Sequence, residues 1–270
     1  MNFSMWTNYL RDTSPEEATA LFAAKGWYNL ELSTEHGEAL LAREGEPIEI
    51  GAKFKAEADR CGVRFPQGHL WLQVDITEDG GVDVIKRWLD LYYGVGVRAC
   101  VLHAGGKRLR ENPEAREAAN VKALKALCAH IAGRDQYICL ENLMESCQRV
   151  SDLRRLIDMV GSPQLKICLD TGHLHVSKGD LAEFITEAGP LLKALHIADN
   201  EGERDQHMMP YGRGGIRWEG LFAALAEVGY DGLFNYEIPG ESFAPHEILM
   251  AKLDYLRAVS AYMIGKIEAR

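Results

Sequence analysis

The chain has 270 residues, 47% of them hydrophobic, and a formal net charge of −10 at pH 7. That length and hydrophobic content suit one large α/β domain with a substantial core. The acidic charge disfavours non-specific attraction to nucleic acid or to an anionic membrane, so we expect neither as a partner.

The cysteines and the N-terminal segment predict a cytoplasmic protein. Six cysteines are present, none of them in a Cys-x-x-Cys pair, and several lie inside apolar runs. This usage is typical of reduced core thiols rather than of disulfides or a zinc ribbon. The segment MNFSMWTNYL lacks the basic start and apolar run of a signal peptide. No apolar run approaches the ~20 residues that a membrane helix needs.

Strand patterns alternate with helix patterns along the whole chain. Near-continuous apolar runs such as 97–103 indicate strands buried on both faces. Helices are indicated by start signals such as Ser14-Pro15-Glu16 and by apolar residues at helical spacing. We expect strands at 3–9, 27–33, 63–72, 97–103, 137–142, 165–170, 192–198 and 232–238. We expect helices to begin near residues 14, 47, 82, 112, 151, 179, 218 and 245.

Strict alternation of eight strands with eight helices predicts a parallel sheet closed into a (β/α)8 TIM barrel, a single domain over residues 1–270. An open doubly wound sheet is the main alternative. That fold more often has a glycine-rich phosphate loop after its first strand, and none is present in this sequence.

Carboxylate and imidazole groups recur at the ends of the expected strands. Glu141, Asp170, His196 and Glu237 end four of them, and in a barrel these ends meet at one mouth. Carboxylates gathered there would repel one another unless a cation lay between them. These four residues therefore predict a divalent metal site, and we expect Mn²⁺, with Zn²⁺, Co²⁺ or Mg²⁺ as alternatives.

Further polar residues border the same expected mouth. A single strand-end acid or histidine is more often a helix cap or a turn residue than a ligand, and agreement across strands is what favours a ligand role. Glu31 also ends a strand, and we interpret it as the partner of a nearby base. Arg213 could meet a substrate phosphate or carboxylate. We expect substrate contacts or additional metal ligands at His69, His103, His173, Asp205, His207 and Arg213.

These residues lie in the motifs CLEN at Glu141, LDTGH at Asp170, HIADN at His196, DQH at Asp205 and NYEI at Glu237. Together with YGRGGIRW, the set resembles the xylose isomerase-like TIM barrel superfamily over nearly the whole chain. That superfamily includes enzymes of the sugar-phosphate isomerase/epimerase type and the family 2 apurinic (AP) endonucleases. The resemblance implies a metal-dependent isomerase or epimerase acting on a small carbohydrate, which can be a sugar, a sugar phosphate or a sugar acid.

In ketose 3-epimerases of this superfamily, the residues matching Glu141, Asp170, His196 and Glu237 hold one metal. The two glutamates also act as acid and base on opposite faces of the sugar. The residue matching His173 contacts the substrate. The resemblance also implies that homo-oligomers are common among such barrels.

Two alternatives remain open from the sequence. An apurinic endonuclease-like phosphodiesterase would hold three zinc ions on residues that all have counterparts here: His69, His103, Glu141, Asp170, His173, His196, Asp205, His207 and Glu237. The acidic charge and the lack of an obvious basic and aromatic insert in the early loops disfavour it. The other alternative is a metal-binding barrel without catalysis.

Overall fold

Eight parallel strands form the wall of a barrel in the computed structural model, which describes residues 1–144 and 146–269. They are short and largely buried, as the apolar runs of the sequence predict. In chain order the strands are β1 (Asn2–Trp6), β2 (Asn29–Leu32), β3 (Arg64–His69), β4 (Ala99–Leu102), β5 (Tyr137–Glu141), β6 (Leu165–Asp170), β7 (Leu192–His196) and β8 (Leu233–Tyr236).

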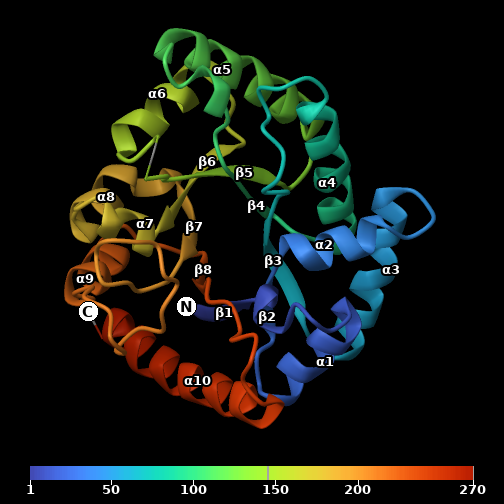
Figure 1. Ribbon diagram of the computed structural model, residues 1–270, viewed down its shortest axis with the longest axis vertical. Coiled ribbons are helices and arrows are strands. Elements are labelled where there is room, and N and C mark those ends of the chain that lie inside the picture. Colours follow the sequence, from blue (N-terminus) through green and yellow to red (C-terminus); the bar gives the residue numbers. More distant parts are fainter. Residues whose placement is uncertain (145, 270) are drawn as a thin grey trace.

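The sheet closes on itself. Its strands follow the order β7-β6-β5-β4-β3-β2-β1-β8, and β7 meets β8 through a parallel bridge between Ile197 and Tyr236. There the Ile197 N–H donates to the Asn235 carbonyl at 2.7 Å. Figure 1 shows the strands at the centre with the helices around them. The structure confirms the predicted (β/α)8 TIM barrel.

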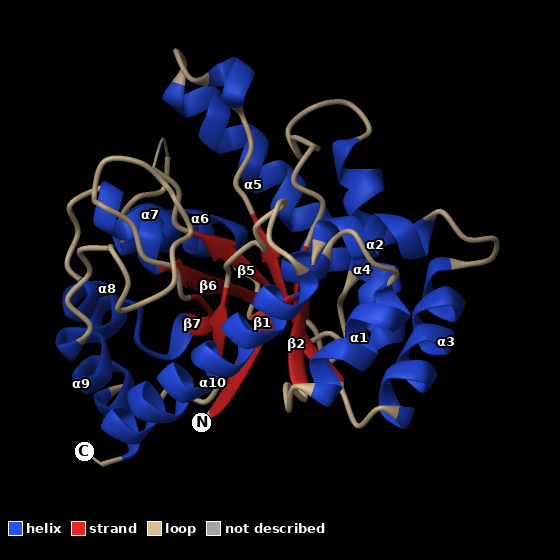
Figure 2. Ribbon diagram, turned by 60° about the horizontal axis from the view of Figure 1, so that its bottom comes forward, coloured by secondary structure: helices blue, strands red, loops and turns tan. Residues whose placement is uncertain are grey.

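Helices cover the outside of the barrel, as Figure 2 shows. The described residues form ten α-helices: α1 (Pro15–Ala24), α2 (Thr34–Leu41), α3 (Pro47–Arg60), α4 (Gly81–Val95), α5 (Pro113–His130), α6 (Val150–Val160), α7 (Thr171–Val176), α8 (Leu181–Ala188), α9 (Glu219–Glu227) and α10 (His246–Glu268).

The expected count of eight helices was wrong because α2 and α7 are short and begin directly after a strand. Ser33 caps α2 by accepting the His36 N–H at 3.4 Å, and Asp170 caps α7 by accepting the His173 N–H at 2.6 Å. The expected first strand was too long, since residues 7–10 form a 3-10 helix. The Thr7 hydroxyl accepts the Ser33 N–H at 2.9 Å at this turn.

The barrel interior beneath the mouth is lined by eight side chains, one from each strand. On seven strands this residue lies two positions before the one that reaches the mouth, and side chains at that spacing point to the same side of a strand. On β2 it is Glu31. None of the eight is more than 1% exposed. We call them the lower ring: Ser4, Glu31, Gln67, Val101, Cys139, Cys168, Ala194 and Asn235.

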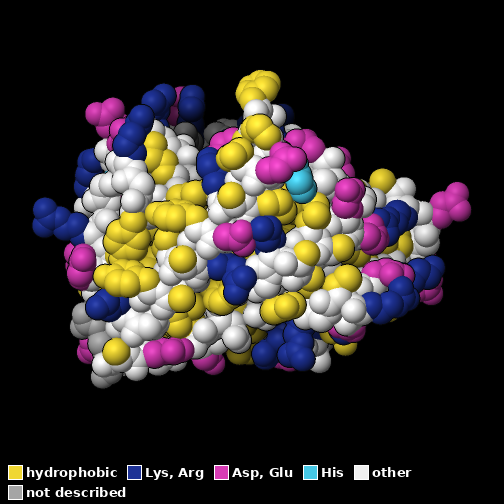
Figure 3. Space-filling view, turned by 90° about the horizontal axis from the view of Figure 1, so that it is seen from below, with side chains coloured by type: hydrophobic (Ala, Val, Ile, Leu, Met, Phe, Trp, Pro, Cys, Tyr) yellow, Lys and Arg dark blue, Asp and Glu magenta, His cyan; other side chains and the backbone are white. Residues whose placement is uncertain are grey.

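The face of the molecule around α10 carries hydrophobic side chains among charged ones, as Figure 3 shows. Tyr255 and Tyr262 of α10 and the nearby Tyr211 are each more than two-fifths exposed. The rings of Tyr211 and Tyr262 form an edge-to-face pair with centroids 5.7 Å apart. Among the described residues, no helix has the length and apolar character needed to cross a membrane.

Candidate metal centre

Three strand-end residues and the residue that follows β8 converge at the barrel mouth. Glu141, Asp170 and His196 are the last residues of β5, β6 and β7, and Glu237 comes directly after β8. All four are at most 5% exposed. The His196 Nδ1 atom lies 3.1 Å from both Glu141 Oε1 and Glu237 Oε2. One potential ligand atom from each residue lies within 4.8 Å of the others.

Asp170 combines a structural contact with a free ligand atom. Its Oδ1 accepts the His173 N–H, which is the helix cap described above. The Asn142 side chain holds its backbone, accepting the Asp170 N–H at 2.7 Å and donating to the Asp170 carbonyl at 3.0 Å. The other oxygen of Asp170, Oδ2, is buried and has no hydrogen-bond partner in the part of the chain that the structure describes. Capping therefore uses one carboxylate oxygen and leaves the other for a ligand.

This group fits a divalent cation. Three buried carboxylates face one imidazole, and an unpaired buried oxygen points to a missing positive partner. Carboxylate oxygens with a single imidazole nitrogen suit Mn²⁺, Zn²⁺ or Co²⁺.

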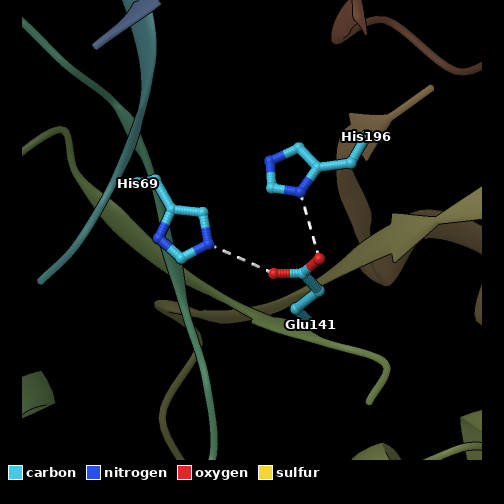
Figure 4. Close-up of side chains that lie close together, drawn as sticks. All are labelled: His69, Glu141 and His196. Atoms are coloured by element: carbon cyan, nitrogen blue, oxygen red, sulfur yellow. Dashed lines mark hydrogen bonds and ion pairs between the residues drawn. The ribbon is translucent and has the colours of Figure 1, made fainter. Parts of the chain in front are cut away.

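His69 and His103 contact the other oxygen of Glu141. The Nε2 atoms of His103 and His69 lie 2.9 and 3.4 Å from Glu141 Oε2. Figure 4 shows Glu141 between His69 and His196, with one carboxylate oxygen turned to each ring. Burial lowers the pKa of His103. Burial would also lower that of His69, but Glu141 outweighs it and the pKa of His69 is raised.

A second group borders the first and consists of His173 on α7 and of Asp205 and His207 on the loop after β7. The Asp205 Oδ2 atom lies 2.8 Å from His207 Nε2 and 3.3 Å from His173 Nε2. The Nδ1–H of each ring donates to a backbone carbonyl, His173 to Asn142 at 2.9 Å and His207 to Glu237 at 2.6 Å. His207 has a φ of 45°, an uncommon conformation for a residue other than glycine. The helix α7 and the loop after β7 thus aim one Nε2 atom each at the Asp205 carboxylate.

Burial and the neighbouring charges shift the pKa values of the first group in different directions. Burial would raise the pKa of both glutamates, but His196 outweighs it, so the pKa of Glu237 falls to about 2 and that of Glu141 falls well below its usual value. Burial raises the pKa of Asp170 to about 7; His173 opposes this rise, and the two glutamates add to it. Both glutamates are therefore ionised at neutral pH.

The second group consists of an acid and two bases that stabilise each other's charged forms. Burial would lower the pKa of both histidines, but Asp170 and Asp205 raise that of His173 to about 11. Asp205 and Glu237 raise that of His207 to about 10. Burial would raise the pKa of Asp205, but the two histidines lower it below the usual range.

The opening of the site lies beside His103 and His207. Their side chains are 34% and 23% exposed, whereas that of Glu141 is 1% exposed. The indole of Trp6, at the end of β1, stacks on His207 with ring centroids 6.4 Å apart. A substrate entering here would meet these three residues before it reached Glu141.

Arg213 lies apart from both groups. Its guanidinium pairs with Glu201 at 3.0 Å, and the side chain is 76% exposed. A substrate contact by Arg213 stays a prediction.

Glu31 is a site-adjacent residue whose partner the sequence left unidentified. It is fully buried on β2, and its Oε1 accepts the Nε2–H of His196 at 3.0 Å. Its Oε2 accepts a hydrogen bond from the Asn235 side chain. The signal in the sequence is an acid at an inward position of the short apolar strand NLEL.

Known proteins resemble this chain in sequence and in fold. An uncharacterized protein, y4fM, from Sinorhizobium fredii is 26% identical over 196 residues, which are 70% of this chain and 61% of that protein. An L-ribulose 3-epimerase from a Methylomonas species is 27% identical over 168 residues, 58% of this chain and 55% of the epimerase. The chain thus matches less than two thirds of the length of either relative.

The fold is similar to that of a solved D-tagatose 3-epimerase-like protein, with a TM-score of 0.80 and 17% identity over 100% of this chain and 99% of the other. The family described as xylose isomerase-like TIM barrel matches residues 26–259. This chain therefore belongs to the xylose isomerase-like TIM barrel family.

Proposed function

We propose that the protein is a metal-dependent epimerase or isomerase of small sugars, with one divalent ion, Mn²⁺, held by Glu141, Asp170, His196 and Glu237. One observation carries the proposal: Glu141 and Glu237, from different strands, approach the same nitrogen of His196 at 3.1 Å. This arrangement brings two carboxylates and one imidazole within reach of a single bound ion. The similarity to an L-ribulose 3-epimerase favours a free ketose as substrate.

Two ionised glutamates can move a proton across a sugar carbon. One accepts the proton from the carbon beside the carbonyl group, and the electron pair moves onto the carbonyl oxygen. Return of a proton from the other glutamate to the opposite face gives the epimer, and return to the adjacent carbon gives the aldose–ketose isomer. A bound divalent ion would supply the positive charge that stabilises the developing oxyanion. We expect His173 and His207 to contact the substrate through their Nε2–H groups, which they would share with Asp205.

The test is a screen of free ketoses, L-ribulose among them, with Mn²⁺-loaded protein in D₂O. We expect an epimer or isomer that carries solvent deuterium at the carbon that exchanged its proton. Glu141→Gln and Glu237→Gln should each lower turnover by about 10²- to 10⁴-fold at saturating Mn²⁺, with an unchanged circular dichroism spectrum. Glu35→Gln, the same chemical change on a partly exposed residue of α2, is the control. Full activity in either site variant would overturn the two-glutamate mechanism.

A phosphodiesterase that uses three zinc ions is a second candidate because the described residues offer three groups of potential ligands. Two of the groups share Glu141 and His196, and the three are His69–Glu141–His196, Glu141–Asp170–His196–Glu237 and His173–Asp205–His207. Metal content of protein purified without an affinity tag separates the two functions. One Mn per chain supports the epimerase. About three Zn per chain, with abasic-DNA cleavage lost in His207→Ala, supports the phosphodiesterase.

We also propose that residues 1–270 act as one domain in the cytoplasm. Light scattering of the pure protein would show whether it forms the homo-oligomer expected from the family. Tight metal binding without turnover of any ketose or abasic DNA would instead favour a barrel that binds metal without catalysis.

A further inference from the structure

The nitrogen of His196 that faces away from the carboxylates of the first group is held by a buried acid. Glu31 lies on β2, across the barrel from β7, and both residues are 0% exposed. The Nε2–H of His196 donates to Glu31 Oε1 at 3.0 Å, while Nδ1 faces Glu141 and Glu237. The two ring nitrogens therefore have separate partners on opposite sides.

An imidazole binds a metal through one nitrogen only when that nitrogen carries no proton. In neutral histidine either nitrogen can carry the single proton, and the partner of the other nitrogen decides which one does. A carboxylate at Nε2 keeps the proton there and leaves the Nδ1 lone pair for the metal. It also fixes the rotation of the ring.

Glu31 is itself fixed. Its second oxygen accepts a hydrogen bond from the Asn235 amide on β8, so each carboxylate oxygen has a donor. Glu31 pairs in register with Trp6 of β1 and Gln67 of β3, which places it within the sheet and away from solvent. A carboxylate buried to this extent is stable only with partners of this kind.

We propose that Glu31 is a positioning residue for the metal site: its carboxylate, held by Asn235, keeps the proton of His196 on Nε2 and aims Nδ1 at the group formed by Glu141, Asp170 and Glu237. The inference rests on the metal site of the proposed function. Glu31 acts through His196 and touches neither metal nor substrate.

The test is calorimetric titration of the metal-free protein with MnCl₂, without any sugar. Glu31→Ala should weaken Mn²⁺ binding by about 10- to 100-fold, the range found when outer partners of ligand histidines are removed. Glu31→Gln should weaken it less, because the amide oxygen still accepts the His196 proton but carries no charge. Glu35→Gln, four residues further along, should bind as the wild type does.

A double variant tests whether weaker Mn²⁺ binding comes from a lost orientation of His196 or from damage to the fold. In Glu31→Gln/Asn235→Asp the two positions exchange amide and carboxylate. The new amide on β2 can accept from His196 and donate to the new carboxylate on β8. The Mn²⁺ affinity of the double variant should exceed that of Glu31→Gln alone. In the Zn²⁺-bound wild type, nitrogen NMR of the histidine rings should show His196 protonated at Nε2.

Several outcomes would overturn the inference. Equal Mn²⁺ affinity in Glu31→Ala and wild type would do so, as would a His196 proton on Nδ1 rather than on Nε2 in the Zn²⁺-bound protein. If Glu31→Ala does not fold, equal affinities of wild type, Glu31→Gln and the double variant would overturn it as well. Failure of the wild type to bind Mn²⁺, Co²⁺ or Zn²⁺ would also overturn the inference. Weaker binding in the Glu31 variants, with no ketose turned over by wild type, would leave the inference standing and reject the epimerase.

Discussion

The two halves of the lower ring differ in chemistry although all eight side chains are equally buried. Strands β8, β1, β2 and β3 contribute the polar half, which consists of Asn235, Ser4, Glu31 and Gln67. Strands β4 to β7 contribute the apolar half, which consists of Val101, Cys139, Cys168 and Ala194 and packs as one cluster. Among the described residues, only the polar half makes side-chain hydrogen bonds to the candidate site or to the residue before it. Glu31 accepts from His196, and Gln67 donates to the Leu195 carbonyl.

The polar half also carries groups that weaken the fold. Ser4 Oγ, Gln67 Oε1 and Asn235 Oδ1 are buried without a hydrogen-bond partner among the described residues. Each such group costs about 1–3 kcal/mol relative to a satisfied one. We infer from this contrast that the apolar half fills space and that the polar half orients His196. Uncharged substitutions in the apolar half should alter stability alone, and changes in the polar half should alter stability and metal binding together.

The largest expected effect comes from placing a charge in the apolar half. Cys168→Asp puts a carboxylate two residues before Asp170, on the same side of β6 and in the cluster formed with Ala99, Val101 and Cys139, whose side chains offer no strong donor. We expect the free energy of unfolding to fall by about 3–5 kcal/mol, as for an unpaired buried charge. Urea denaturation measures it, with Cys168→Ala as the control. A Cys168→Asp protein as stable as that control would show that water or a donor reaches this half.

Gln67→Leu is the corresponding change in the polar half and should have a smaller effect on stability. It removes the hydrogen bond from Gln67 Nε2 to the Leu195 carbonyl, which is 3.3 Å long and next to His196. We expect a loss of about 1–3 kcal/mol in the free energy of unfolding. Because the lost contact supports the strand end that carries His196, Mn²⁺ should also bind more weakly in titration calorimetry. Unchanged Mn²⁺ affinity in Gln67→Leu would contradict the role assigned to this half.

The fold followed from the sequence because its signals are local and repeated. Apolar runs such as ACVL in β4 and helix starts such as Ser14-Pro15 recur in each βα unit, and a parallel sheet of eight strands has one common closure. The missed helices α2 and α7 lack this redundancy. Ser33, directly after β2, caps α2, and Asp170, the last residue of β6, caps α7, so the sequence at these positions predicts a loop.

The candidate site was predictable as far as strand ends are concerned, because the ends of β5, β6 and β7 must meet. The partners of each atom were not predictable. The lone acid in NLEL suggested a base near Glu31, but only the barrel closure brings β2 and β7 face to face, 165 residues apart, so that this base is His196. The pairing of Arg213 with Glu201 likewise depends on the path of a long loop, and the hydrophobic pattern of the sequence does not predict that path.

Cys139→Ala is the apolar counterpart of Gln67→Leu, because both residues are buried in the lower ring. Removing the buried sulfur leaves a small cavity, and we expect a loss of roughly 1 kcal/mol in the free energy of unfolding. Metal affinity should not change, because Cys139 makes no hydrogen bond to the candidate site among the described residues. Urea denaturation and Mn²⁺ titration on the same preparation measure both. A weakened Mn²⁺ affinity would show that the apolar half also supports the site.

The weakest predicted effect is a pH dependence of stability that arises outside the lower ring, at His36 on the helix that follows β2. Burial raises the pKa values of Cys139 and Cys168 well above their usual range, so the apolar half gains or loses no proton near neutrality. On α2, which follows β2 of the polar half, burial lowers the pKa of His36, and the Thr13 carbonyl and Glu35 oppose the shift. His36 Nε2–H donates to the Thr13 carbonyl at 3.2 Å, and Nδ1 has no partner among the described residues.

The direction in which stability changes with pH depends on whether the folded or the unfolded chain binds the proton of His36 more tightly. The unfolded chain protonates His36 near its ordinary pKa of 6.5, whereas the folded chain keeps the ring neutral to lower pH. Unfolding therefore takes up a proton, and stability falls as pH falls from about 7 toward the lowered pKa. Urea midpoints between about pH 8 and pH 5 should decline more steeply in wild type than in His36→Gln, whose amide still donates to Thr13 and cannot titrate. The histidines of the metal site titrate in both proteins and cancel in the comparison, so parallel curves would mean that His36 is protonated in the fold and that a hydrogen-bond acceptor faces Nδ1.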